Sequence, residues 1–138
     1  MSSEEHTGRV AATVIPRTQK GEEYLVAWRV DHEMWEFVGG KEEYRENGAP
    51  EGLEETAERE IKEELGLDIE AEEVAGEYSW QAGGHEIVPV RATHGYQDIE
   101  EHLELREEKH GRYRYIDPEN HDIDLGKERN CLEAFDLA

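Results

Sequence analysis

One segment, residues 52–65, constrains the fold of this chain more than any other, because its apolar side chains recur at the spacing of an α-helix. When successive residues are placed about 100° apart, these side chains fall in one stripe along the helix. The stripe consists of Leu53, Ala57, Ile61 and Leu65. Gly66 follows directly, and glycine readily takes the positive φ that ends a helix. The sequence therefore predicts an amphipathic helix that packs this stripe against a core.

Three glutamates lie at the rim of the stripe instead of on the far side of the helix. Glu60, Glu63 and Glu64 stand at i, i+3 and i+4 and therefore share one face. Their mutual repulsion would mildly destabilise an isolated helix, whereas a divalent cation would turn it into attraction. Carboxylate oxygens are the natural ligands of Mg²⁺, which also binds substrate phosphates. Taken alone, the helix fits a solvated acidic face equally well, because 36 of the 138 residues are Asp or Glu.

The composition describes an acidic but folded chain. Its net charge of −21 and its 36% hydrophobic residues would be typical of disorder, but the apolar residues are patterned and include three Trp and six Tyr. We expect one domain over residues 1–138, with a flexible segment at 1–8. The acidity argues against nucleic-acid and anionic-membrane partners, which bind basic patches. An anionic phosphate substrate fits only if cations bridge it to the protein.

The charges also suggest where the protein works. The acids are spread along the whole chain, and Arg (10) outnumbers Lys (5), a pattern that resembles a cytosolic protein adapted to molar salt. No signal peptide or membrane span is visible, so a cytoplasmic protein is expected. The lone Cys131 excludes an intramolecular disulfide and is expected to be a small buried residue. The seven histidines show no zinc-binding spacing.

The other elements are predicted from alternating apolar patterns and turn residues. Strands are expected at 10–15 and 23–30, joined as a hairpin, and at 35–38, 72–80, 84–93, 101–106 and 112–117. Residues 41–50 are expected to form a loop, and a C-terminal helix is expected from Asp122 or Asp124 to Leu137. Strands mixed with one central and one terminal helix predict an α/β sandwich.

The glutamate helix belongs to a longer pattern that begins at two glycines. Gly39 and Gly40 let the backbone approach a metal or phosphate, and Glu51 follows. After seven more residues comes the run Arg59-Glu60-Ile61-Lys62-Glu63-Glu64-Leu65-Gly66-Leu67. The pattern resembles the box of the Nudix hydrolases, G-x5-E-x7-R-E-U-x-E-E-x-G-U with U aliphatic, and every position from Glu51 to Leu67 fits. The lead-in Trp35-Glu36-Phe37-Val38-Gly39-Gly40-Lys41 resembles the family's W-E-F-P-G-G-K.

This sequence departs from the family pattern at two places, neither of which involves a carboxylate. Ten residues, instead of five, separate Gly40 from Glu51, and Val38 stands where proline is common. The resemblance implies a Nudix-type αβα sandwich with a mixed central sheet, covering residues 9–137.

The resemblance also implies roles for the residues of the box. Glu60, Glu63 and Glu64 would hold Mg²⁺ or Mn²⁺, and one of them would serve as base for the attacking water. The Gly40 carbonyl would complete the coordination shell, and Arg59 would orient Glu63 or Glu60. Glu51 would be structural or an outer ligand.

Family members often add an acid from a loop after the box. Glu108 is the first candidate, because Glu108-Lys109-His110 precedes Tyr113-Arg114-Tyr115-Ile116-Asp117-Pro118, which resembles a late E-H-x-x-Y-R-W-V segment. Glu104 and Glu107 are alternatives, and His110 is a candidate neighbour of the site. Trp28, Trp35, Trp80 and Tyr78 are expected mainly in packing, with Trp35 the best candidate to stack on a base because it adjoins the glycines.

The function implied by the resemblance is cleavage of a phosphoanhydride bond in a nucleoside diphosphate linked to another group. The first interpretation is an ordinary or oxidised nucleoside triphosphate, such as 8-oxo-dGTP, cut to the monophosphate and pyrophosphate. Dinucleoside polyphosphates and nucleotide sugars are alternative substrates, and a non-catalytic nucleotide-binding module is an alternative of another class. In each case the partner is a small nucleotide.

Overall fold

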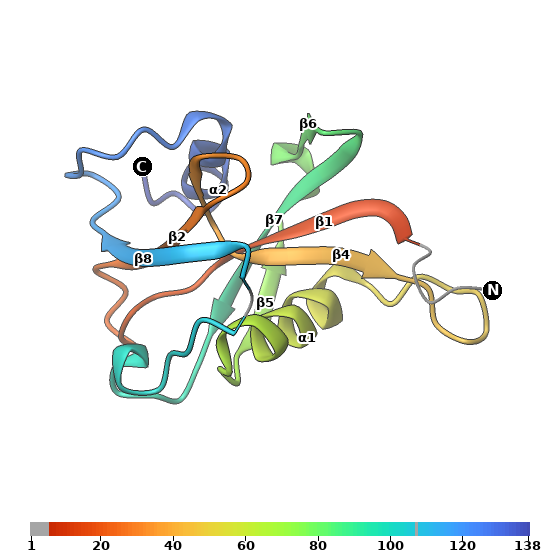
Figure 1. Cartoon of the computed structure of the whole chain (residues 1–138), viewed down its shortest axis with the longest axis horizontal. Coiled ribbons are helices and arrows are strands. Elements are labelled where there is room, and N and C mark those ends of the chain that lie inside the picture. Colours follow the sequence, from red (N-terminus) through yellow and green to blue (C-terminus); the bar gives the residue numbers. More distant parts are fainter. Residues whose placement is uncertain (1–5, 107) are drawn as a thin grey trace.

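The computed structural model describes residues 6–106 and 108–138, which form two β-sheets with helices around them (Figure 1). The strands are β1 (His6–Val14), β2 (Tyr24–Arg29), β3 (Met34–Glu36), β4 (Gly39–Glu43), β5 (Glu70–Val74), β6 (Trp80–Ala82), β7 (His85–Thr93) and β8 (His110–Ile116). The α-helices are α1 (Leu53–Leu65) and α2 (Arg129–Ala134). Three short 3₁₀ turns complete the described elements: η1 (Gly76–Tyr78), η2 (Ile99–Glu101) and η3 (Gly126–Glu128).

The large sheet is mixed, as the sequence predicts. Its strand order is β4-β1-β7-β5, with β6 added on β7. The central strand β1 runs parallel to β7 and antiparallel to β4, with Ala12 opposite Pro89 on one side and Gly39 on the other. Gly39 is required at this close approach, because a Cβ atom there would lie 1.7 Å from the carbonyl oxygen of Ala11.

The small sheet has the order β3-β2-β8, and it shows that the predicted hairpin of residues 10–15 and 23–30 is wrong. These segments belong to different sheets and meet only where they diverge, through a bridge between Pro16 and Tyr24 and a 3.0 Å bond from the Leu25 amide to the Ile15 carbonyl. The reason lies in the large sheet, where β4 and β7 already occupy both edges of β1.

The helix predicted at 52–65 is confirmed as α1, and its stripe lies in the core. Leu53 and Ala57 pack against Ala11, Val88 and Val90 of the large sheet. Farther along, the helix packs against residues of both sheets and their connections; this cluster contains Ile15, Leu25, Val38, Ile61 and Leu65. Burying a side chain such as Ile61 or Leu65 completely contributes about 1.5–3 kcal/mol. Figure 1 shows α1 and α2 on opposite sides of the large sheet, which gives the predicted αβα arrangement.

The segment at 101–106, predicted as a strand, is instead tied to the end of α1. Gly66 ends the helix at φ 70°, as expected. The amides of Glu104 and Arg106 donate to the carbonyls of Leu65 and Glu64, at 3.0 and 2.8 Å. The segment 101–106 does have an apolar pattern. Its backbone amides, however, pair with carbonyls at the end of the helix that lack a partner within the helix, and not with a strand.

Other predicted bounds shift by a few residues. Residues 6–8 are part of β1, so the flexible N-terminal segment expected at 1–8 is too long, and residues 1–5 lie outside the described residues. The loop expected at 41–50 starts later, because β4 extends to Glu43. The strand expected at 72–80 is divided among β5, η1 and β6, and the C-terminal helix is reduced to η3 and α2.

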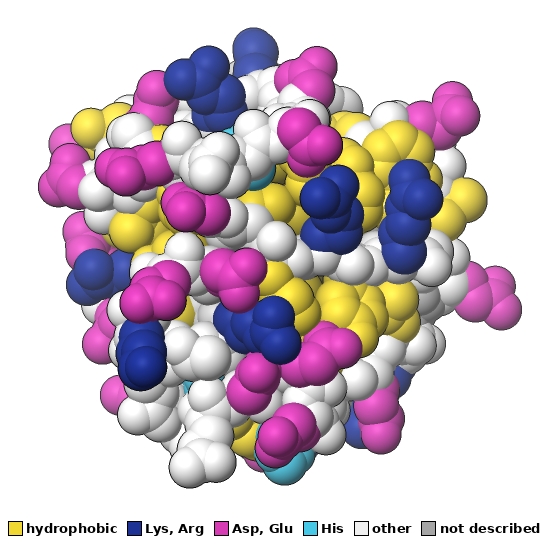
Figure 2. Space-filling model, turned by 90° about the vertical axis from the view of Figure 1, so that its left-hand side faces the viewer, with side chains coloured by type: hydrophobic (Ala, Val, Ile, Leu, Met, Phe, Trp, Pro, Cys, Tyr) yellow, Lys and Arg dark blue, Asp and Glu magenta, His cyan; other side chains and the backbone are white. Residues whose placement is uncertain are grey.

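The surface carries both signs of charge despite the large acidic excess. Figure 2 shows one face on which acidic side chains are scattered among a few Lys and Arg side chains, several of them lying over hydrophobic groups. Elsewhere in the contacts of the molecule, the guanidinium carbon of Arg112 lies 5.2 Å from the centre of the Trp28 ring. Among the described residues no helix combines the length and the apolar character that crossing a membrane requires.

Candidate active site

A cavity of about 740 Å³ opens between the two sheets, and we call it the inter-sheet cavity. Its walls come from β1, β6 and β7 on one side and from β3 and the following residues on the other; they include Val10, Ala12, Trp80, Ile87, Met34, Glu36 and Phe37. Gly40 and Glu60 of the box line the same cavity. Its volume lies in the range of small-molecule sites, so the carboxylate helix borders a space that could take a nucleotide.

Arg59 is the residue that holds the box together. Its guanidinium binds both oxygens of Glu51, at 2.7 and 3.1 Å, and also donates to the Lys41 carbonyl at 3.0 Å. It then reaches Glu60 at 2.8 Å and Glu63 at 3.4 Å. The prediction that Arg59 orients Glu60 or Glu63 therefore describes its weaker contacts, and its two-pronged bond with Glu51 is the stronger one.

Glu51 occupies a structural position. Its carboxylate also accepts hydrogen bonds from the Thr56 hydroxyl, at 2.7 Å, and from the Glu43 amide, at 3.1 Å. Burial disfavours its charged form, but the hydrogen bonds from Arg59 and Thr56 outweigh burial and lower the pKa of Glu51. Every oxygen of this carboxylate is in use, so Glu51 anchors the helix start to β4.

Glu60 lies directly against Gly40, near the start of β4. A Cβ atom at residue 40 would come within 2.2 Å of the Glu60 carboxyl carbon, so only glycine lets this side chain reach the backbone of β4. Burial raises the pKa of Glu60, the Arg59 contact lowers it, and the neighbouring negative charge of Glu63 raises it again. The structure thus brings Gly40, Glu60 and Arg59 together, as the sequence predicts.

Glu64 is the most deeply buried of the three helix glutamates, with its side chain 3% exposed. One carboxylate oxygen pairs with the ammonium of Lys109, and the other is buried without a hydrogen-bond partner. Burial raises the pKa of Glu64 to about 7, against the lowering effect of Lys109, and the charges of Glu60 and Glu36 add to the rise. Glu63, by contrast, is 55% exposed, and Arg59 is the one ion-pair partner of its side chain among the described residues.

The carboxylate oxygens at this end of the cavity suit a hard divalent cation, although the glutamate side chains now pair with the protein's own Arg59 and Lys109. Among residues 6–106 and 108–138 no three carboxylate, imidazole or thiol groups already form a metal cage. The reason is visible in the contacts, since Glu60 and Glu63 bind Arg59 and Glu64 binds Lys109. The unpartnered oxygen of Glu64 marks a place where a cation would satisfy a buried carboxylate.

The late acidic ligand stays a prediction. Glu108 is exposed, and it is its neighbour Lys109 that reaches Glu64. Glu104 pairs with Arg106 at 3.2 Å on the surface, and Glu107 lies outside the described residues. His110, expected near the site, is buried, and its Nε2 lies 2.9 Å from Glu36, which lines the cavity.

Two residues on the cavity wall were not found from the sequence. Lys109 had no signal beyond its position beside Glu108. Glu128 is 6% exposed, lines the cavity and accepts a 2.9 Å hydrogen bond from the Phe37 amide, 91 residues away in the chain. Trp80 also lines the cavity, whereas Trp35 is not among the described residues that do; it packs edge-on against Trp28 at 5.4 Å.

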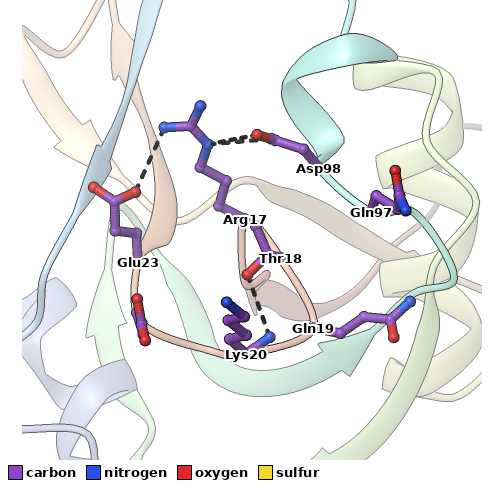
Figure 3. A pocket seen from close by; sticks show the side chains of 8 residues that line it. Arg17, Thr18, Gln19, Lys20, Glu23, Gln97 and Asp98 are labelled. Atoms are coloured by element: carbon purple, nitrogen blue, oxygen red, sulfur yellow. Dashed lines mark hydrogen bonds and ion pairs between the residues drawn. The ribbon is translucent and has the colours of Figure 1, made fainter.

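A second hollow, of about 630 Å³, lies at the turn between β1 and β2. Figure 3 shows Arg17 between Glu23 and Asp98 in this hollow. Its guanidinium binds Asp98 at 3.1 Å and reaches Glu23 at 3.5 Å, so its charge is already balanced. Because the box residues lie elsewhere, the inter-sheet cavity is the stronger candidate site.

Comparison with known proteins agrees with this fold. The family model of the NUDIX domain matches residues 7–134, and the chain therefore belongs to the NUDIX family. The predicted Nudix hydrolase is thus confirmed at the level of the family. No curated protein sequence matched the chain.

Solved structures show the same fold at low sequence identity. A MutT protein from Methanosarcina mazei Go1 is 22% identical, with a TM-score of 0.68 over 98% of this chain and 96% of its own. A C. elegans Ap4A hydrolase is 19% identical, with a TM-score of 0.57 over 82% of each chain. An ADP-ribose pyrophosphatase from Streptococcus suis 89-1591 is 18% identical, with a TM-score of 0.59 over 91% of this chain and 90% of its own. At these identities the likeness concerns the fold, and the substrate must be argued from the site.

Proposed function

We propose that this protein hydrolyses a phosphoanhydride bond of a nucleoside triphosphate, releasing the nucleoside monophosphate and pyrophosphate with the help of Mg²⁺ or Mn²⁺. One observation carries the proposal: Glu60 lines a nucleotide-sized cavity, and Arg59 binds Glu60 and Glu63 on the helix that also carries Glu64. In the reaction water adds to one phosphorus, the anhydride P–O bond breaks, and a proton is released.

The box residues would hold the ion, and the rest of the site would hold the substrate. Glu60, Glu63, Glu64 and the Gly40 carbonyl are the proposed ligands, and Glu108 is a proposed additional one. When bound, the ion would neutralise phosphate oxygens and acidify the attacking water. Lys41 and Lys109 also line the cavity and can bind phosphate oxygens, which a chain of net charge −21 otherwise repels.

The helix positions the proton acceptor. Glu60 and Glu63 are the candidates for this role, because each keeps a carboxylate oxygen that is not bonded to Arg59. Arg59 fixes both side chains relative to β4 through Glu51, so the proposed acceptor is held by the fold and not by the substrate. A positioned acceptor of this kind contributes about 10²–10⁴-fold to rate.

The test is hydrolysis by the purified protein in molar KCl with Mg²⁺. The panel contains 8-oxo-dGTP, the ordinary dNTPs, diadenosine tetraphosphate and ADP-ribose. We expect turnover of a nucleoside triphosphate, lost in Glu63→Gln and in chelator. Turnover should be retained in the control Glu55→Gln, which changes an exposed acid of the same helix that pairs with Arg45 and makes no contact with Arg59. Faster turnover of diadenosine tetraphosphate or ADP-ribose would replace the triphosphate as substrate. Tight binding without metal-dependent hydrolysis would favour a binding module.

A further inference from the structure

Lys109 places a positive charge of the protein itself inside the proposed metal site. Its one ion pair among the described residues joins its ammonium to a carboxylate oxygen of Glu64, a proposed metal ligand whose side chain is 3% exposed. The Lys109 side chain is 28% exposed and lines the inter-sheet cavity. The cation that partners this buried carboxylate therefore comes from the chain and lies at the cavity wall.

The backbone around Lys109 is held by hydrogen bonds, so an exchange of partners would involve its side chain alone. The Lys109 carbonyl accepts a 2.8 Å hydrogen bond from the Val30 amide. The next residue, His110, is buried and begins β8. Before Lys109, the Arg106 amide donates to the Glu64 carbonyl at 2.8 Å. These contacts keep the lysine beside Glu64, whereas its four-carbon stem leaves the ammonium free to move.

The three helix glutamates do not have the same partners. Glu60 and Glu63 both bind Arg59, but Glu64 has Lys109 as its cationic partner, and its second carboxylate oxygen is buried without a hydrogen bond. A divalent ion held by Glu64 would stand beside the ammonium, and two cations that close in a buried place repel each other strongly. The metal ion and the Lys109 ammonium therefore compete for the same carboxylate.

We propose that Lys109 is an internal counter-ion of the metal site: its ammonium neutralises Glu64 while no metal is bound, and a divalent cation displaces it from that carboxylate. This inference rests on the proposed function, because it concerns the same metal site. Before metal binds, the ammonium limits the repulsion among the helix glutamates. It also lowers the apparent metal affinity, because the ion binds only the fraction of molecules in which Glu64 is free. Lys109 is thus the residue that sets this affinity.

The first test measures the binding of Mg²⁺ alone, by calorimetry in molar KCl, where screening suppresses weak binding to the many surface acids. It is made at pH 9, above the pKa of about 7 to which burial raises Glu64, so that this carboxylate is charged. Lys109→Met removes the competing ammonium and keeps an unbranched side chain, and it should tighten Mg²⁺ binding about 10- to 100-fold. Loss of a merely structural lysine would weaken Mg²⁺ binding or leave it unchanged.

Matched variants separate this contact from the general effect of losing a positive charge. Lys41→Met removes the other lysine that lines the cavity, and it should change the Mg²⁺ dissociation constant less than about 3-fold in molar salt. Lys109→Arg keeps a cation that can bind Glu64, so Mg²⁺ should bind no more tightly than to the wild type. Lys109→Met combined with Glu64→Gln should bind Mg²⁺ no more tightly than Glu64→Gln alone, because the shared carboxylate is gone.

A second measurement needs no variant. Lysine side chains of the wild type are acetylated briefly with and without Mg²⁺, and the modified peptides are quantified by mass spectrometry. Exposed Lys20, in the turn between β1 and β2, is the internal reference. An ammonium paired with Glu64 is shielded from the reagent, so Mg²⁺ should raise the modification of Lys109 relative to Lys20 several-fold. An unfolded Lys109→Met protein would leave the decision to this measurement, where equal ratios with and without Mg²⁺ would overturn the inference.

The outcomes distinguish the two proposals. If Lys109→Met binds Mg²⁺ no more tightly than the wild type, or no more tightly than Lys41→Met, then Lys109 is not the counter-ion, whatever the hydrolysis assay shows. If binding tightens but no triphosphate is hydrolysed, the counter-ion role stands and the proposed reaction fails. If neither the wild type nor Lys109→Met binds Mg²⁺, both proposals are overturned.

Discussion

Two groups of buried carboxylates in this molecule are treated in opposite ways. Glu42 and Glu51, at β4 and the start of α1, are surrounded by donors. Glu42 is fully buried and binds Arg9 through both oxygens, at 2.9 and 2.8 Å, with further bonds from Thr7 and the Gly52 amide. Glu64 and Glu128, which face or adjoin the cavity, have no arginine and few donors.

The electrostatic result differs accordingly. Burial opposes the charge of Glu42, but Arg9, Thr7 and the Gly52 amide outweigh it and lower the pKa of Glu42. Burial dominates at Glu64 and Glu128 and raises their pKa values to about 7 and about 8. A carboxylate that the fold satisfies completely stabilises the fold, whereas one that the fold leaves short of donors is free for a ligand. We therefore infer that the first pair serves the fold, and Glu64 and Glu128 are the pair to test for function.

The sharpest way to break this comparison is to neutralise Glu64. Glu64→Gln removes a proposed metal ligand, so kcat/KM for the best triphosphate should fall at least about 100-fold. Stability should change by less than about 1 kcal/mol, because the lost ion pair with Lys109 is offset by removal of a buried charge. Activity assays and urea unfolding of the same preparation check both parts. A clearly destabilised protein with full turnover per folded molecule would show that Glu64 belongs with the structural pair.

The second test uses the acid form of Glu128. A folded pKa of about 8 lies above the value of about 4.3 for an unfolded glutamate, so the folded protein binds an extra proton between these values. Stability from this group is therefore fully present below about pH 4 and is lost as pH rises through about 8, by as much as about 5 kcal/mol. Urea unfolding of the wild type and of Glu128→Gln at pH 5, 7 and 9 should show this component only in the wild type. Parallel curves would mean that Glu128 is ionised in the folded protein.

The third test concerns the structural pair. Glu42→Gln leaves Arg9 without its carboxylate and should destabilise the fold by about 2–3 kcal/mol, at the low side of the effect for a buried pair because Arg9 is 40% exposed. Turnover per folded molecule should stay within a few-fold of wild type, since Glu42 is not among the residues that line the cavity. Lys62→Met, which breaks an exposed pair with Asp68, is the control and should cost less than about 1 kcal/mol. Equal losses in the two variants would remove the distinction between buried and exposed pairs.

The part of the site that could be predicted is the part encoded locally. Periodicity alone places Glu60 and Glu64 at the rim of a buried stripe, and the stop at Gly66 follows from one residue type. The placing of Glu51 and Arg59 follows from the family pattern. These features depend on contacts between residues that are close in the sequence, so they can be predicted from one sequence.

The rest depends on contacts between distant segments. Nothing in the neighbourhood of Glu128 shows that its carboxyl meets the Phe37 amide, because the contact forms only when η3 folds onto the loop before β4. The segment 101–106 has a strand-like pattern, but its amides donate hydrogen bonds to carbonyls at the end of α1 and not to a neighbouring strand. The hairpin prediction failed for the same reason, since the choice of β4 and β7 as neighbours of β1 is made by the whole sheet.

The smallest expected effect on stability comes from the many exposed acidic side chains, which belong to neither group of buried carboxylates. Their mutual repulsion at a net charge of −21 should weaken the fold in dilute buffer, and salt should screen it within a Debye length of about 10 Å at 0.1 M. Moving from 0.1 M to 2 M KCl should therefore raise stability by about 1 kcal/mol, or roughly 2–6 °C in Tm. Glu42→Gln and wild type should gain equally, because the buried pair is hardly screened. A protein whose Tm is the same at both salt concentrations would not be adapted to molar salt, and its acidity would then need another explanation.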